Sequence, residues 1–268
     1  MGDGPVYHGA SGPGNHARLV GRLRAAVEES HADPLPRADP PAIPPTVDPV
    51  MAALSLLSGG LDSTVATALH AARVGPVELG LFIDYGQRAA GPEERAALAV
   101  GRALGFEVLV TQIPLLGQLS NAALVDRSAE LPHPDPERVD VTATETAAAV
   151  WIPNRNGVLV NLAAAVAEAR GLDRLIVGFN AEEAASFPDN SARFLANLDA
   201  CLEDSTMGRV SLSCPTLELG KAAILEAGRE VGAPLDLTWS CYDGGEEACG
   251  RCESCVRRAR AERGATSL

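Results

Sequence analysis

Apolar runs that alternate with amphipathic stretches are the feature that most limits how this 268-residue chain can fold. The first part of the pattern reads as strand, helix, strand, helix and strand, over residues 52–57, 63–73, 77–83, 93–104 and 107–112. The second part reads as helix, buried strand, helix and helix, over residues 157–170, 174–179, 191–204 and 221–231. This alternation predicts an open, mostly parallel, doubly wound α/β sheet with helices on both faces, and ligands bind such sheets beyond the carboxyl ends of the strands.

A loop of small residues follows the first predicted strand and opens the first predicted helix. Its sequence is Ser58-Gly59-Gly60-Leu61-Asp62-Ser63-Thr64. Two glycines let the backbone approach an anion closely, and the amide groups at a helix start bind a phosphate without any side-chain cation. The hydroxyl groups can add donors, and Asp62 can cap the helix or hold Mg²⁺ through water. The alternative is a turn that merely joins strand to helix, and the loop matches neither Walker A nor GxGxxG.

Four of the six cysteines fall within one short segment. Their spacing is C-x7-C-x2-C-x2-C, formed by Cys241, Cys249, Cys252 and Cys255. Four thiolates can close a tetrahedron around Zn²⁺, and a closed site of this kind holds structure rather than performing chemistry. An iron–sulfur cluster and a set of unmetallated thiols are the alternatives. Cys201 and Cys214 stand apart from this segment, and both are predicted to be buried packing residues.

An excess of acidic side chains limits the partners of the protein. With 22 Lys and Arg against 35 Asp and Glu, the formal net charge is −13, which disfavours direct contact with RNA or DNA. Lys221 is the only lysine in the sequence. No run of about 18 uncharged apolar residues occurs, and residues 1–13 lack the basic and apolar parts of a secretory signal. We therefore expect a cytoplasmic protein without a membrane or nucleic-acid partner.

The loop at residues 58–64 resembles the PP-loop, SGGxDS, of the ATP pyrophosphatase superfamily. Further segments extend the resemblance to the QueC family of 7-cyano-7-deazaguanine synthases, over residues 51–258: Asp84-Tyr85-Gly86-Gln87-Arg88, Ile152-Pro153-Asn154-Arg155-Asn156, residues 216–221, residues 238–242 and residues 249–255. The resemblance implies a ligase that converts 7-carboxy-7-deazaguanine and ammonia to the nitrile and cleaves ATP to AMP and pyrophosphate. It also implies Mg²⁺ and Zn²⁺ as cofactors, and a homo-oligomer, with a dimer as the expected form.

The same resemblance assigns roles to individual residues. ATP binding is expected of Leu57, Ser58, Gly59, Gly60, Leu61, Asp62, Ser63, Thr64, Val65, Ala66, Thr67, Asp84, Tyr85 and Gln87. Catalytic roles are expected of Asp62, Ser63, Arg155 and Lys221. Substrate contacts are expected of Arg155, Asn156, Pro188 and Asp189. Each of the less specific assignments has a plain alternative: ordinary turn chemistry at residues 84–87, helix capping by Asn154 or Asn156, and a solvated side chain for Lys221.

The chain divides into three predicted parts. Residues 1–49 hold Gly-rich and Pro-rich pieces around one short helical pattern near residues 16–29, which predicts a partly flexible N-terminal arm. Residues 50–237 form the nucleotide-binding α/β domain, and residues 238–268 form the zinc-binding C-terminal region. Within the domain, residues 126–140 carry prolines around His133 and are predicted to form a loop or lid.

Two segments depart from the family pattern. Ala89 stands where the family commonly has a histidine, and residues 180–191 replace an Asp-Tyr-Ser-Gly-Tyr-Pro-Asp-Cys-Arg stretch. Pro188 and Asp189 are retained, whereas Asn190 replaces the cysteine. These departures leave open a divergent ligase that joins a related deazapurine carboxylate to another amine. A tRNA-thiolating PP-loop enzyme and a non-catalytic partner-binding module are further alternatives.

Overall fold

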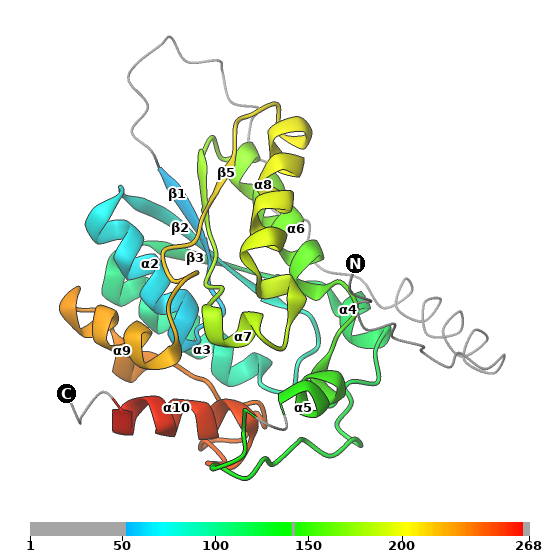
Figure 1. Ribbon diagram of the computed structural model, residues 1–268. Coiled ribbons are helices and arrows are strands. Elements are labelled where there is room, and N and C mark those ends of the chain that lie inside the picture. The colour runs from blue at the N-terminus through cyan, green and yellow to red at the C-terminus, as the bar shows by residue number, and fades with distance from the viewer. Residues whose placement is uncertain (1–51, 141–142, 265–268) are drawn as a thin grey trace, which may run out of the picture. The chain divides into compact units, whose positions relative to one another are not determined.

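A parallel five-stranded sheet forms the centre of the protein (Figure 1), in a computed structural model that describes residues 52–140 and 143–264. The strand order is β3-β2-β1-β4-β5, and every neighbouring pair is parallel. The strands are β1 (Ala53–Leu56), β2 (Val77–Asp84), β3 (Glu107–Gln112), β4 (Arg174–Ile176) and β5 (Ser211–Ser213). The predicted open α/β sheet is confirmed, although β4 is shorter than the predicted strand at residues 174–179.

Helices flank the sheet at the predicted places. They are α2 (Leu61–Arg73), α3 (Ala90–Leu104), α4 (Pro114–Gln118), α5 (Ala143–Val150), α6 (Arg155–Ala169), α7 (Ala181–Ala184), α8 (Ala192–Ser205), α9 (Lys221–Glu230) and α10 (Glu253–Gly264), with 3-10 turns η1 (Pro188–Asn190) and η2 (Leu235–Leu237). Helix α3 begins three residues before the predicted residue 93, because Pro92 is compatible with a first helical turn. The sequence patterns did not predict α5 or α10.

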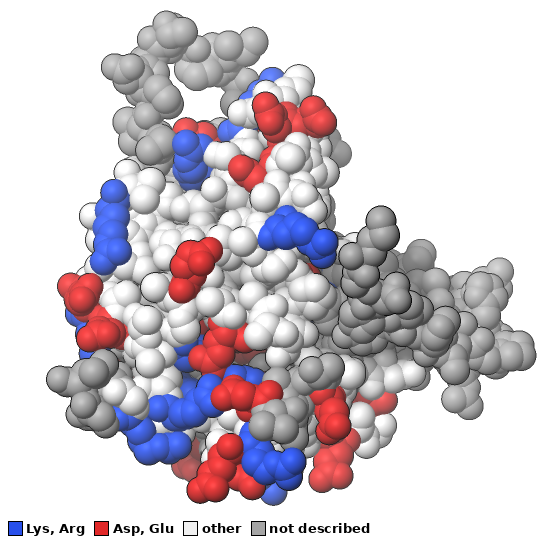
Figure 2. Space-filling view, viewed as in Figure 1, with Lys and Arg blue, Asp and Glu red and all other residues white. Residues whose placement is uncertain are grey.

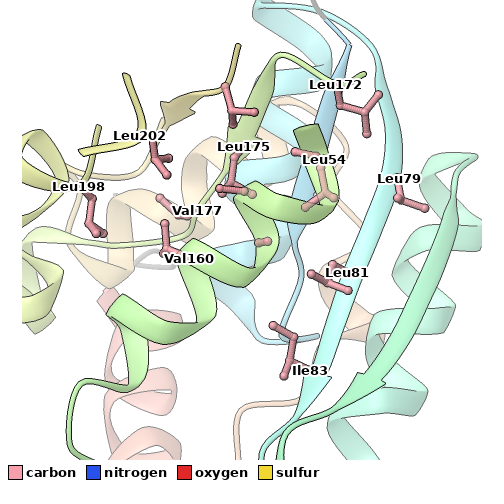
Figure 3. Close-up of a cluster of buried hydrophobic side chains, with 14 of the residues drawn as sticks. Leu54, Leu79, Leu81, Ile83, Val160, Leu172, Leu175, Val177, Leu198 and Leu202 are labelled. Carbon is pink, nitrogen blue, oxygen red and sulfur yellow. The ribbon is translucent and has the colours of Figure 1, made fainter. Parts of the chain in front are cut away.

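Alternate side chains of the strands point to opposite faces of the sheet. Leu54 and Leu81 are fully buried against α6 and α8, as Figure 3 shows for the cluster around Val160 and Leu198. Phe82 lies on the other face, where it packs with Val100 of α3. Burial of one such side chain contributes about 1.5–3 kcal/mol to the free energy of folding, so apolar packing on both faces stabilises the sheet.

The order of the strands creates a switch point in the sheet. From β1 the chain adds β2 and β3 on one side, and it later adds β4 and β5 on the other side of β1. Helices that follow β1 and β4 therefore leave the sheet in opposite directions, and the carboxyl ends of these two strands border a crevice. Residues 58–64 follow β1 at this crevice, which is where a parallel sheet binds its ligand.

Several sequence predictions concern surface and loop features. Residues 120–140 contain turns but no helix or strand, so the predicted loop at residues 126–140 is confirmed. The prediction that Cys201 is buried is wrong, because it lies on the exposed side of α8, whose buried residues are Leu198 and Leu202. Cys214 follows β5 and packs against the core as predicted, but it is only half-buried. The predicted arm at residues 1–49 lies outside the described residues.

The described surface carries charges of both signs. Figure 2 shows Lys and Arg interspersed with Asp and Glu on the face that it presents. Near α10, Arg260 pairs with Asp140 at 2.5 Å and with Glu182 at 2.7 Å. Within residues 52–140 and 143–264, every helix is too short or too polar to cross a bilayer.

Candidate active site

The loop at residues 58–64, hereafter the phosphate loop, depends on its first glycine. Gly59 has a φ of 75°, and a Cβ atom at this position would lie 2.4 Å from the carbonyl oxygen of Glu93. Only glycine fits, because both the backbone conformation and the space exclude a side chain. The turn it makes brings Gly60 to the N-cap position of α2.

The start of α2 leaves its amide groups available for an anion. Gly60 provides no side-chain cap, so the first N–H groups of the helix are not satisfied by a capping oxygen. Ser58 Oγ accepts a hydrogen bond from Gly60 N at 3.2 Å and lies 2.9 Å from Ser63 Oγ. Hydroxyl groups and open amides therefore converge at one helix N-terminus, an arrangement that binds phosphate.

Lys221 is buried in a cluster with two carboxylates, Asp62 and Glu183, hereafter the Lys221 cluster. Its Nζ donates to Asp62 Oδ2 and, at 2.6 Å, to Glu183 Oε1, and the residue is 8% exposed. The alternative of a solvated lysine is therefore wrong. Asp62 Oδ1 is also buried, and it has no hydrogen-bond partner among the described residues. The cluster places one cation and one unsatisfied carboxylate oxygen beside the phosphate loop.

Burial and charge act in opposite directions on the pKa values of the Lys221 cluster. Burial alone lowers the pKa of Lys221, but the charges of Asp62 and Glu183 raise it above its ordinary value. Burial raises the pKa of Asp62, and the nearby Lys221 only partly offsets this effect. For Glu183 the attraction and hydrogen bond of Lys221 outweigh burial, so its pKa is lowered. Lys221 therefore stays charged between the two carboxylates.

Arg155 provides a second cation that lines the same cavity as Lys221. Its Nη1 donates to Tyr85 Oη at 3.3 Å, and its Cζ lies 5.8 Å from the centre of the Tyr85 ring. Burial lowers the pKa of Arg155, but Tyr85 and Asp189 raise it above its ordinary value. Asn156 Nδ2 donates to the backbone oxygen of Asp189 at 3.2 Å. These contacts fix the guanidinium at the N-terminal end of α6.

The capping alternative for the asparagines before α6 is not supported. Asn154 occupies the N-cap position with a φ of 52°, but its side chain makes no capping hydrogen bond. Asn156 lies within the first helical turn and donates to Asp189 instead. Turn chemistry does occur after β2, where Asp84 Oδ1 accepts from Gly86 N at 2.8 Å and Gln87 Oε1 accepts from Tyr85 N at 2.8 Å.

One cavity of about 240 Å³ brings most of the predicted residues together. The predicted residues that line it are Leu57, Ser58, Gly60, Leu61, Asp62, Ser63, Tyr85, Gln87, Arg155, Asn156 and Lys221. The cavity lies at the carboxyl ends of β1 and β2 and at Gly178, which follows β4. A Cβ atom on Gly178 would lie 2.6 Å from Ser63 N, so glycine allows this segment to pass close to the phosphate loop.

The remaining predicted residues do not line the cavity. They are Gly59, Thr64, Val65, Ala66, Thr67, Asp84, Pro188 and Asp189. Val65 packs in the core between α2 and α9, and the hydroxyl of Thr67 lies 2.6 Å from that of Ser55. Gly59, Asp189 and the four residues of α2 are buried and support the site from within the fold, whereas Asp84 is half-buried and Pro188 is exposed.

The cavity also contains residues that the sequence analysis missed. They include Glu93, Gly178, Glu183, Trp239, Ser240 and Tyr242. Glu183 lies at residues 180–191, which depart from the family pattern, and Trp239 lies at residues 238–242, which resemble the family. Both segments were recognised in the sequence, but neither residue was given a role. No signal in the sequence marked Glu93, because an acidic residue in a first helical turn is common on any surface helix.

The four clustered cysteines form a separate, closed site. Their Sγ atoms all lie within 4.8 Å of one another, and Cys241, Cys252 and Cys255 are buried. Cys241 Sγ accepts hydrogen bonds from the backbone N–H groups of Asp243 and Cys249, at 3.4 and 3.3 Å. Amide groups that point at a sulfur stabilise its thiolate form, so the donor set fits a thiolate-bound metal.

The segment before the first of these cysteines ties the metal site to the phosphate loop. Trp239 N donates to Gly59 O at 2.8 Å, and the Trp239 indole Nε1 donates to Cys241 O at 2.8 Å. Trp239 therefore bonds to both sites and lines the cavity between them.

Taken together, these features define a parallel α/β protein with a cavity suited to an anionic ligand and a four-cysteine cluster that could hold a metal ion. A parallel sheet presents a phosphate loop at its switch point, two buried or half-buried cations border one cavity, and four cysteines close a second site beside it. The model of the family described as queuosine biosynthesis protein QueC matches residues 52–265, so the chain belongs to that family.

Curated relatives agree with this assignment. The chain is 44% identical over 216 residues to the 7-cyano-7-deazaguanine synthase of Methanosarcina mazei, covering 79% of this chain and 93% of the relative. It is 46% identical over 213 residues to the protein of the same name from Pelotomaculum thermopropionicum, covering 79% and 96%. It is 48% identical over 217 residues to that of Desulforudis audaxviator, covering 80% and 98%. The resemblance predicted from the sequence motifs is confirmed.

Proposed function

We propose that this chain makes 7-cyano-7-deazaguanine from 7-carboxy-7-deazaguanine, ammonia and ATP, for the synthesis of queuosine-type tRNA nucleosides. ATP is cleaved to AMP and pyrophosphate in the process. The observation that carries the proposal is the convergence of the phosphate loop, Lys221 and Arg155 on one cavity. The family and the names of the curated relatives support the same product.

The chemistry explains why such a site needs two cations. A carboxylate oxygen is a poor leaving group, so the substrate must first be joined to AMP before ammonia can displace that oxygen and form an amide. Adenylation of the amide oxygen then permits elimination to the nitrile. Both reactants of the first step are anions, and their repulsion must be offset by fixed positive charge. Lys221 and the amides of α2 would hold the phosphates, and Arg155 would hold the substrate carboxylate.

Two metal ions complete the proposal. Cys241, Cys249, Cys252 and Cys255 would bind Zn²⁺ as a structural ion, because four thiolates leave no open coordination position. Asp62 would bind Mg²⁺ together with the phosphates, since its Oδ1 is buried without a partner among the described residues. Elemental analysis tests the zinc, and a brown protein that contains iron would overturn it in favour of an iron–sulfur cluster.

The remaining expectations follow from charge and family. A net charge of −13 favours a small-molecule substrate over direct tRNA contact. A homodimer in the cytoplasm is the expected state. Sedimentation analysis at several protein concentrations tests the dimer, and a tRNA affinity that falls steeply with salt would contradict the absence of a nucleic-acid partner.

The central experiment measures products. The purified protein is incubated with 7-carboxy-7-deazaguanine, ATP, Mg²⁺ and ammonium, and mass spectrometry should detect AMP and the nitrile. The Asp62→Ala variant should lose AMP formation and keep its bound zinc, because Asp62 lies at the phosphate loop and away from the cysteines. AMP formation that is independent of the deazaguanine, or an active Asp62→Ala variant, would contradict the proposal and favour a non-catalytic module.

A divergent ligase is the second candidate, and the cavity itself motivates it. Ala89 and Asn190, the two departures from the family pattern, both line the cavity. The acceptor could then be an amine other than ammonia, and a mixture of amines in the same assay would reveal the preferred one. Thiolation of tRNA is less favoured, because neither Cys201 nor Cys214 lines the cavity that the described residues form.

A further inference from the structure

Three carboxylates line the cavity, and one of them has no cation as its partner. Asp62 and Glu183 are both paired with Lys221. Glu93, on the first turn of α3, makes no salt bridge within the described part of the chain. A carboxylate that faces a reaction cavity without a cation to neutralise it is available to accept a proton.

The surroundings of Glu93 hold it in place and leave one oxygen free. Gln87 Nε2 donates to Glu93 Oε2 at 2.9 Å, and Gln87 is itself fixed by Tyr85 N at 2.8 Å. The other oxygen, Oε1, makes no hydrogen bond to any described residue. Glu93 lines the same cavity as the phosphate loop, and its backbone oxygen lies against Gly59.

The charged groups around Glu93 come from two other elements. Burial raises its pKa to about 7, the Gln87 hydrogen bond and Arg155 of α6 lower it, and Asp84 of β2 raises it. A carboxyl group that titrates near neutral pH is half ionised there, so it can both take up and give up a proton during a reaction cycle. The phenol of Tyr85 also faces this group, but burial raises its pKa, so it remains protonated.

The proposed reaction needs a proton acceptor. Ammonia exists almost entirely as ammonium at neutral pH, and ammonium has no lone pair with which to attack a carbonyl carbon. Attack by ammonia on the adenylated carboxylate also leaves a positive nitrogen, which must lose a proton before the amide is stable. Neither Lys221 nor Arg155 can accept this proton, because both are already protonated cations.

We propose that Glu93 is the proton acceptor for the amine in this reaction. The inference rests on the proposed function. The nitrogen lone pair forms the bond to the acyl carbon, the bond from that carbon to the AMP oxygen breaks, and its electron pair leaves with AMP. Glu93 Oε1 takes the proton that ammonium must lose before its nitrogen can attack, and solvent takes the proton that the nitrogen loses after the bond to carbon has formed. Glu93 releases its own proton to solvent before the next turnover.

The test separates adenylation from amine attack. Glu93→Gln keeps the size and the contact to Gln87 but removes the base, so it should lower amide formation from ammonium by on the order of 10²–10⁴-fold at neutral pH. Pyrophosphate exchange into ATP that depends on 7-carboxy-7-deazaguanine should stay near the wild-type rate. Glu93→Asp should retain intermediate activity, and Glu94→Gln, which changes the neighbouring residue outside the cavity lining, should behave as wild type.

Hydroxylamine gives the decisive comparison. It is largely uncharged at neutral pH, so it needs no base to become a nucleophile, and the Glu93→Gln variant should form the hydroxamate at close to the wild-type rate. Equal losses with ammonium and with hydroxylamine, or loss of pyrophosphate exchange in the variant, would overturn the proposed role of Glu93 and leave the proposed function of the protein standing. Absence of exchange in the wild-type protein would overturn the proposed function and this role together.

Discussion

The phosphate loop and the four-cysteine site use opposite strategies to hold a charged ligand. The loop offers backbone amides and depends on a residue without a side chain, Gly59, and it opens onto a cavity. The cysteine site offers four side chains that converge within 4.8 Å. An open site can admit and release a nucleotide, whereas a closed one holds an ion permanently. Damage to the first should therefore impair turnover, and damage to the second should impair folding.

Trp239 connects the phosphate loop to the four-cysteine site, so a change at one site can disturb the structure of the other. Its backbone N–H donates to Gly59 O, and its indole donates to Cys241 O. The metal region thus supplies part of the support for the phosphate turn. Substitutions at the two sites should therefore affect stability and turnover to different extents, with some overlap.

The largest expected effect is on the closed site. Cys252 is fully buried, and Cys252→Ser should release the metal because a complete thiolate set is needed to hold it. A structural zinc site can contribute on the order of 10 kcal/mol to folding, so we expect a loss of several kcal/mol in the free energy of unfolding. Elemental analysis and denaturant unfolding measure the two effects. Cys201→Ser, at an exposed position, is the control. If Cys252→Ser kept its full metal content and wild-type stability, the cysteine site would not be needed for folding.

A smaller loss of stability is expected at the open site. Lys221→Met leaves two carboxylates in the Lys221 cluster without their cation, which costs about 3–5 kcal/mol for a buried pair. Thermal unfolding should show this loss while the metal content stays constant. The matched control is Arg73→Met, which removes an exposed pair with Glu230 at 3.7 Å and should cost less than about 1 kcal/mol. Equal effects of the two substitutions would contradict the burial of Lys221.

Turnover should respond more than stability to the glycine of the loop. In Gly59→Ala the new Cβ would meet Glu93 O, so the turn must shift, and a shift of about 1 Å can lower the rate by about 10²-fold. AMP formation is the measurement. Gly105→Ala is the control, because Gly105 has a φ of 87° but open space around its Cβ position. It should cost about 1–2 kcal/mol of stability and leave the rate unchanged, and a similar rate loss in both variants would show that strain alone is responsible.

The smallest effect concerns stability as a function of pH. Burial raises the pKa of Glu93 from 4.5 to about 7, so on increasing pH the unfolded chain loses this proton first and the folded state becomes less stable by comparison. The cost begins near pH 4.5 and is complete above about pH 7. This rise corresponds to at most about 3 kcal/mol, and partial exposure of the carboxylate to solvent reduces it. Glu93→Gln should therefore gain about 1–2 kcal/mol of stability at pH 8 and nothing at pH 4, whereas the control Glu94→Gln should show no such difference between the two pH values. Denaturant unfolding at the two pH values measures this, and a gain that is the same at both would contradict the raised pKa.

Local sequence patterns were sufficient for the fold class and for locating the two loops that we propose bind ligands. Alternating apolar runs predict parallel strands and helices because period and length are properties of neighbouring residues. The Gly59-Gly60 turn and the cysteine spacing are local in the same sense, and both occur where they were expected. Two helices were harder to predict from these patterns, since α10 is strongly polar and α5 is a short segment rich in alanine.

Tertiary structure alone decided which side chains meet. Lys221 reaches Asp62 across 159 positions of sequence, and Arg155 reaches Tyr85 across 70 positions. The strand order brings these elements to one crevice, and no local pattern encodes that order, because it results from packing of the whole core. Burial of Lys221 and exposure of Cys201 were decided in the same way. The amino-acid sequence alone thus determined the fold class and the two binding loops, and the folded chain determined which charges lie together, since burial and pairing exist only after distant segments pack.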